Sequence, residues 1–350
     1  MKLERGLVRQ WVMFGAASLL LTACNPSADT GNQAGDAETG EAAAPETEAT
    51  AEAETDVRRS REDILEEYEE ALEEARSTSG SGSPALWTLS DEDTTVYLFG
   101  TVHLMRPDVE WRTDDFTQKF DSADTVVLEL DMESEAGQRA LARDFLSKGY
   151  YGDGRTLSSE LSERDLEAFA EALKALGLPV SAFDPMEPWM AAMNLSVMQL
   201  QTEGFDPNAG IEQTLIADAK EDGKDFEFLE TASDQLNIFD TMAEPLQAQY
   251  LYETAVTMED THVMLDQIID EWLDGDVEGL GTLVANPGTG GGEDVYNALF
   301  LSRNSKWVPK IEALLDEPGT VFVAVGAGHL AGPDSVITML RNEGYEVEGP

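Results

Sequence analysis

Thr94-Thr-Val-Tyr-Leu-Phe99 is followed directly by Gly100-Thr-Val-His103, and Thr320-Val-Phe-Val-Ala-Val325 is followed by Gly326-Ala-Gly-His329. Both runs are rich in β-branched and aromatic residues and end at a glycine, which is typical of strands. Each stretch therefore predicts a strand whose carboxyl end carries the motif Gly-x-x-His. Open α/β sheets gather their active sites at the carboxyl ends of their strands. The two stretches thus indicate both a fold class and the place of a site.

Two further strands are predicted over residues 125–130 and 226–230, and each ends in a carboxylate, Glu129 in the first and Glu230 in the second. Two imidazoles and one or two carboxylates at neighbouring strand ends suit a divalent transition metal such as Mn, Co, Zn or Fe. Such an ion lowers the pKa of a bound water. The alternative is that His103 and His329 are unrelated residues that happen to follow strands.

Helical periodicity fills the chain between these strands. The segments with apolar residues at helical spacing are 116–121, 133–148, 160–176, 181–202, 211–221, 235–274, 296–315 and 333–341, and a last strand is predicted at 346–348. This alternation predicts an α/β domain, with α+β possible, in which helices flank a mixed central sheet and a helical insertion separates its two halves. The Met-rich segment 185–198 is interpreted as a buried helix, or alternatively as an apolar substrate wall. His262, the third histidine, is expected to be a surface residue of a helix.

The N-terminus has the pattern of an export signal. Residues 1–23 combine a basic start with a short apolar run, which is shorter than a membrane-spanning helix. The run ends in Leu-Thr-Ala directly before Cys24, the sequence of a bacterial lipobox, so we expect Cys24 to be lipidated. Residues 24–83 are expected to form a disordered acidic tether that contains a short charged helix. The folded domain is then expected over 84–350, in a protein attached to a bacterial membrane and facing the periplasm or the exterior.

Charge and cysteine content exclude several classes of protein. The 350 residues include 22 basic and 70 acidic side chains, a formal net charge of −48. So acidic a surface repels phosphate backbones and anionic lipid head groups, which excludes nucleic-acid binding. Cys24 is the only cysteine, so an intrachain disulfide and a Cys-ligated zinc site are excluded. With 42% hydrophobic residues, the chain still has enough apolar surface for a substantial core.

The paired Gly-x-x-His motifs resemble those of the TraB/PrgY/GumN family, which includes the Tiki metalloproteases. Further short pieces agree with the family in order along residues 84–350: 127–131, 210–213, 228–231, 272–276, Arg303-Asn304 with Trp307, and 325–333. The chain departs from the family at Glu212, where Asp is usual, so no role is assigned to this position.

The resemblance implies metal-dependent hydrolysis of peptide bonds, with His103, His329 and Glu129 as metal ligands. It also implies that Glu230, Arg303 and Asn304 line the site. In this interpretation the second carboxylate acts as general base, and Arg303 binds a substrate carboxylate or a developing oxyanion. The alternative for Arg303 is a buried partner for a nearby acid.

Three functions remain open from the sequence. The first is a lipid-anchored metallohydrolase of the cell envelope that acts on peptides. The second is a non-catalytic lipoprotein that binds a small peptide or another ligand, and the third is a metal-dependent esterase. The oligomeric state is not predicted.

Overall fold

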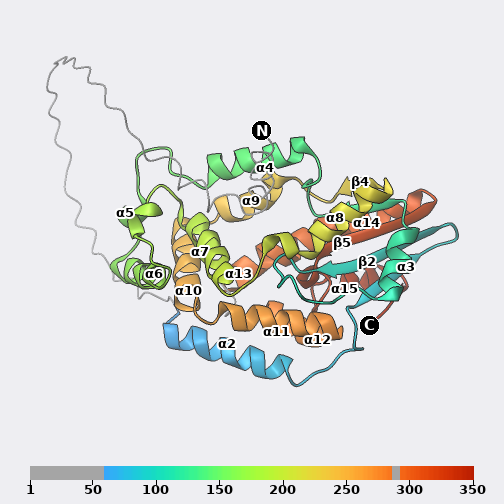
Figure 1. Ribbon diagram of the computed structural model, residues 1–350, viewed down its shortest axis with the longest axis horizontal. Coiled ribbons are helices and arrows are strands. Elements are labelled where there is room, and N and C mark those ends of the chain that lie inside the picture. Colours follow the sequence, from blue (N-terminus) through green and yellow to red (C-terminus); the bar gives the residue numbers. More distant parts are fainter. Residues whose placement is uncertain (1–58, 286–291) are drawn as a thin grey trace, which may run out of the picture.

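A six-stranded mixed sheet forms one half of the molecule (Figure 1). The computed structural model describes residues 59–285 and 292–350. The strand order is β4-β3-β5-β2-β1-β6. The strands are β1 (Leu86–Ser90), β2 (Thr94–Thr101), β3 (Thr125–Leu128), β4 (Asp225–Phe228), β5 (Gly319–Gly326) and β6 (Val347–Glu348). The predicted α/β class and mixed sheet are confirmed. β1 was not predicted from the sequence.

Four of the strands run parallel. β5 pairs with β2 on one side and with β3 on the other, and β3 pairs with β4. β1 continues the sheet antiparallel to β2, and the short edge strand β6 pairs antiparallel with β1. The carboxyl ends of β2, β3, β4 and β5 therefore meet at one edge of the sheet. The residues of β5 alternate between its two faces, with Phe322 and Ala324 on one and Val323 and Val325 on the other, and all four are buried. This explains why the strand is almost continuously apolar.

Helices fill the two long connections, from β3 to β4 and from β4 to β5. The first holds α4 (Glu135–Lys148), α5 (Leu157–Glu160), α6 (Glu163–Ala175), α7 (Pro188–Thr202) and α8 (Ile211–Asp222). The second holds α9 (Ala232–Asp240), α10 (Glu244–Val256), α11 (Thr261–Asp274), α12 (Val277–Ala285), α13 (Gly292–Tyr296) and α14 (Ser302–Ala313). The remaining helices are α3 (Asp114–Ser122) between β2 and β3, and α15 (Val336–Glu343) between β5 and β6. The predicted helical insertion is thus present.

The apolar core has a sheet part and a purely helical part. Side chains of α3, α8 and α11 cover one face of the sheet, and α14 and α15 cover the other. A separate cluster joins α4, α6, α7, α9 and α10 beside the sheet (Figure 1). Met186, Trp189 and Met190 are fully buried in this helical cluster. The methionines of this segment are therefore core, as the first interpretation predicted, and none of them lines the cavity described below.

The helix expected within the tether packs onto the folded domain. α2 (Arg61–Ala75) lies along α11 and α12 (Figure 1). It begins at a capping box in which Ser60 and Asp63 each bond the other's backbone. Ile64 and Tyr68 are buried against α10, α11 and α12. Within the described residues, packing onto the domain therefore includes α2, on the N-terminal side of the boundary expected at Pro84, because the apolar face of α2 contacts α10, α11 and α12.

The predicted signal peptide, Cys24 and the segment up to residue 58 lie outside the described residues. Within 59–285 and 292–350, none of the helices has the length and apolar character needed to span a membrane.

Candidate active site

The sheet brings the predicted site residues to a single edge. His103 follows β2, Glu129 follows β3, Glu230 follows β4 and His329 follows β5. Because β2 and β5 are adjacent and parallel, the two Gly-x-x-His motifs lie side by side, with Gly100 paired to Val325 in the sheet register. The prediction that these strand ends converge is confirmed.

Glycines allow the two motifs to approach each other closely. A Cβ on Gly100 would lie 2.8 Å from the Cα of Ala327, so a larger residue there would collide with the second motif. A Cβ on Gly326 would lie 3.2 Å from Glu129 Oε1, 3.4 Å from His103 Nε2 and 3.6 Å from His329 Cδ2. The two imidazoles and the carboxylate thus converge on the main chain of Gly326.

Glu212 holds the first histidine. Its Oε1 lies 2.5 Å from His103 Nδ1 and also accepts a hydrogen bond from the hydroxyl of Thr101. Glu212 is in the first turn of α8. The helix can start this close to the first motif because position 210 is a glycine: a Cβ there would lie 2.3 Å from the carbonyl oxygen of His103. His103 is half exposed, whereas Glu212 is buried. The pair fixes the imidazole so that its Nε2 faces Gly326.

Asn304 fixes the orientation of the second histidine, His329, through a contact at its Nδ1 atom. Its Nδ2 donates to the carbonyl of Asp334, at 2.7 Å, so its Oδ1 is the atom that faces His329 Nδ1, at 2.6 Å. His329 must then carry its proton on Nδ1 and present an unprotonated Nε2. Trp307 packs on the same imidazole, with ring centroids 4.3 Å apart. Each histidine therefore turns Nε2 inward and is held at Nδ1 by a neighbour.

Arg303 lies between the acids and the second histidine, and all five of its N–H groups have acceptors. Nε donates to Glu230, Nη1 donates to His329 Nε2 at 2.8 Å and to the carbonyl of Leu299, and Nη2 donates to Glu129 at 2.5 Å and to Glu230 at 2.6 Å. In the structure Arg303 is a buried partner for the nearby acids Glu129 and Glu230, which is the alternative role considered for it. In this arrangement the guanidinium group of Arg303 has no N–H free to bind an oxyanion.

The protonation states follow from these contacts. Glu212 raises the pKa of His103 to about 9, against the effect of burial. Burial lowers the pKa of His329 to about 3, and the charge of Arg303 adds to this. Burial alone would raise the pKa of Glu129, but Arg303 and the two histidines outweigh it and lower that pKa to about 2. Burial raises the pKa of Glu230, and Arg303 opposes it.

A metal ion fits these residues in donor type but not in their present arrangement. Two imidazole Nε2 atoms and a carboxylate are suitable ligands for a divalent transition metal, and outer partners at each Nδ1 are typical of metal-binding histidines. However, Arg303 occupies the lone pair of His329 Nε2. In the parts of the chain that the structure describes, no three His, Cys, Asp or Glu side chains form a ready metal site. Metal binding requires Arg303 to release His329 and His103 to lose its proton.

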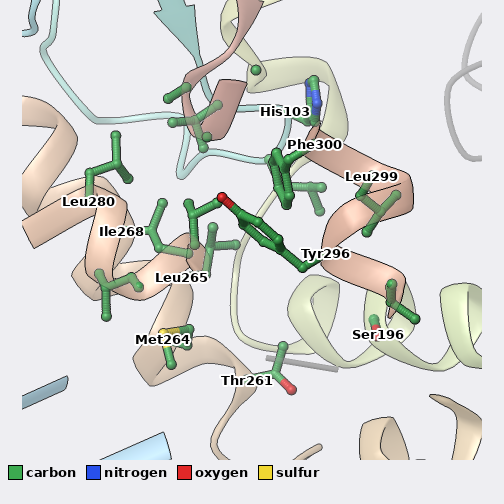
Figure 2. A pocket seen from close by; sticks show the side chains of 18 of the residues that line it. His103, Ser196, Thr261, Met264, Leu265, Ile268, Leu280, Tyr296, Leu299 and Phe300 are labelled. Carbon is green, nitrogen blue, oxygen red and sulfur yellow. The ribbon is translucent and has the colours of Figure 1, made fainter. Parts of the chain in front are cut away.

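A cavity of about 480 Å³ opens onto the two histidines and Arg303. It extends between α11 and α12 on one side and the helical turn of Tyr296, Leu299 and Phe300 on the other (Figure 2). His103 lies at one end and Thr261 at the other. Among the predicted site residues Glu129, Glu230 and Asn304 do not line the cavity, because they contact Arg303 and His329 from the side away from it.

Sequence reasoning left out two members of this network. Glu212 received no role, although its position in the motif at 210–213 pointed to the site. Gln235 in α9 donates to Glu129 Oε2 at 2.8 Å, and no local pattern marks it. His262, in the first turn of α11, is partly buried and does not line the cavity.

Comparison with known proteins adds the following. A family model described as the TraB/PrgY/gumN family matches residues 85–349. The uncharacterized protein YbaP of Escherichia coli (strain K12) is 26% identical over 246 residues, 70% of this chain and 87% of YbaP. An uncharacterized protein of Treponema pallidum (strain Nichols) is 25% identical over 271 residues, 73% of this chain and 79% of that protein. The metalloprotease TIKI1 of Danio rerio is 50% identical over 52 residues, only 14% of this chain and 10% of TIKI1. No solved structure is significantly similar.

Proposed function

The chain belongs to the TraB/PrgY/gumN family, and from that premise we propose that it is a metal-dependent hydrolase that cleaves amide bonds of peptides. The observation that carries the proposal is the convergence of His103 Nε2, Glu129 Oε1 and His329 on Gly326 at the mouth of a large cavity. The partial likeness to a protein named as a metalloprotease supports it. His103, His329 and Glu129 would hold the ion, which is Mn, Co, Zn or Fe.

The charge of the site favours a cation. His103 and Arg303 are opposed by three carboxylates, those of Glu129, Glu212 and Glu230, so the network carries one net negative charge. When bound, a divalent ion supplies a polarised water whose pKa is lowered. Glu212 and Asn304 orient the two imidazoles, and Glu230 positions Arg303 through the hydrogen bonds from Nε and Nη2. Glu230 is therefore assigned a positioning role here, in place of a general base.

The test is metal analysis of the purified full-length protein, combined with turnover of a peptide library. We expect about one metal ion per chain, and a loss of activity of at least about a hundredfold in the double variant His103→Ala/His329→Ala. His262→Ala is the matched control, because this histidine is not part of the cavity lining or of the network around Arg303, and it should retain wild-type activity. Absence of stoichiometric metal, together with undiminished turnover in the double variant, would refute the proposal.

A non-catalytic binding protein is the second candidate, and the size of the cavity favours it. Ligand sites are usually concave and mostly apolar, as this cavity is. If the protein binds ligand without metal, and the histidine double variant binds equally well, this candidate replaces the first.

A metal-dependent esterase would use the same residues. Parallel amide and ester substrates distinguish it from a peptidase.

The proposed location is the cell envelope, with a lipid on Cys24 as the membrane anchor. The support is the basic and then apolar N-terminus that ends directly before the only cysteine. A peptide or another small molecule is the proposed substrate, and nucleic acid is excluded as a partner by the net charge.

A further inference from the structure

The cavity extends well beyond the histidines. The part that we call its far part is lined by residues of α10, α11 and α12, together with Tyr68 of α2. The aliphatic side chains of α11 and α12 in this lining are Met264, Leu265, Ile268, Leu280, Leu283 and Val284. Among the described residues that line the cavity, none is Asp, Glu or Lys. In a chain with 70 acidic residues, a lining without acidic side chains is a specific feature of this cavity.

Four hydroxyl groups of the far part already donate hydrogen bonds within the protein. Tyr68 donates to the carbonyl of Asp260 at 2.6 Å. Three threonines of the lining donate to the carbonyl four residues earlier: Thr254 to Tyr250, Thr257 to Glu253 and Thr261 to Thr257, at 2.8 to 3.1 Å. These four residues therefore offer a ligand apolar surface and no hydrogen-bond donor. This part of the lining is largely apolar, although several of its residues are nominally polar.

Such a lining suits hydrocarbon and not a peptide main chain. Each peptide unit brings an N–H and a C=O group, and burying them without hydrogen-bond partners is costly. A hydrocarbon chain needs no such partners and gains free energy from every methylene that leaves water.

We propose that the cavity binds a long aliphatic acyl chain, and that the substrate is an N-acylated peptide or amine whose acyl carbonyl lies beside His103. This inference rests on the proposed hydrolase function and names its substrate class. In the reaction, water attacks the acyl carbon and the C–N bond breaks. The hydroxyl of the water remains on the acyl carbon, and its proton goes to the leaving amine. The products are a fatty acid and a free amine.

The first test measures binding of N-acyl alaninamides, from butanoyl to hexadecanoyl, to the full-length protein by calorimetry. The free amide head group is neutral, so the series varies only the chain. Affinity should increase by about fourfold per added methylene until the cavity is full. Affinity that does not change with chain length would overturn the inference.

Two variants test whether the acyl chain binds in this cavity. Ile268→Trp adds bulk inside the cavity (Figure 2), so the affinity for hexadecanoyl alaninamide should fall at least tenfold while butanoyl alaninamide binds as before. Leu146→Trp is the matched control, because Leu146 is exposed on α4. Equal loss in both variants, or no loss in Ile268→Trp, would place the chain elsewhere and overturn the inference. The wild-type series does not depend on how either variant folds.

Release of alaninamide, measured in the same series, separates this inference from the proposed function. Chain-length-dependent binding without release supports the acyl cavity and counts against hydrolysis. Release that is independent of chain length supports hydrolysis and overturns the acyl cavity.

Discussion

At the scale of single residues, Arg303 holds the site together. It is buried and is the counter-charge for Glu129 and Glu230, which are buried as well. Arg303→Met should therefore lower the free energy of unfolding by about 3 kcal/mol or more, because it leaves two buried carboxylates without a partner. Urea unfolding measures this. Arg139→Met is the control, since Arg139 pairs with Glu135 on the exposed face of α4, and it should cost only about 0.5 kcal/mol. Equal losses in the two variants would contradict the role given to Arg303.

The same residue shows how far sequence reasoning reaches. Gly-x-x-His after two strands was enough to place His103 and His329 at one sheet edge, because parallel neighbours end together. The motifs could not show whether Arg303 is free or paired. Its acceptors Glu129, Glu230 and His329 follow three different strands, so the pairing depends on how these strands are arranged. Gln235 was missed for the same reason: its bond to Glu129 joins residues far apart in sequence.

At the scale of elements, α2 is the clearest departure from expectation. The periodicity of residues 57–76 correctly indicated a helix, but its partners, α11 and α12, lie almost 200 residues further along the chain. Packing predicts that Ile64→Ala costs about 2 to 5 kcal/mol in urea unfolding, because Ile64 is fully buried. Glu70→Ala on the exposed face of the same helix should stay within about 0.5 kcal/mol. A helix that belonged to a loose tether would tolerate both changes equally.

At the scale of the whole molecule, charge determines how the protein meets a membrane. With a net charge of −48, electrostatic attraction to anionic lipid is excluded, so the proposed membrane attachment depends on the proposed lipid on Cys24. Cys24→Ser should therefore move nearly all of the protein from the membrane pellet to the soluble fraction. Immunoblots of pellet and supernatant after a high-salt wash measure this. Cys24→Ser protein that still pellets after the wash would show that another anchor exists.

The position of β5 has a consequence for the order of folding. This strand lies in the middle of the sheet, between β2 and β3, although it follows β1 to β4 in the sequence. Until residues 319–326 emerge, β2 and β3 have no common neighbour, and His103 and Glu129 have no Gly326 to converge on. Contacts between residues so distant in sequence form slowly, because a long loop must close first. The candidate site is therefore incomplete until β5 has joined the sheet between β2 and β3.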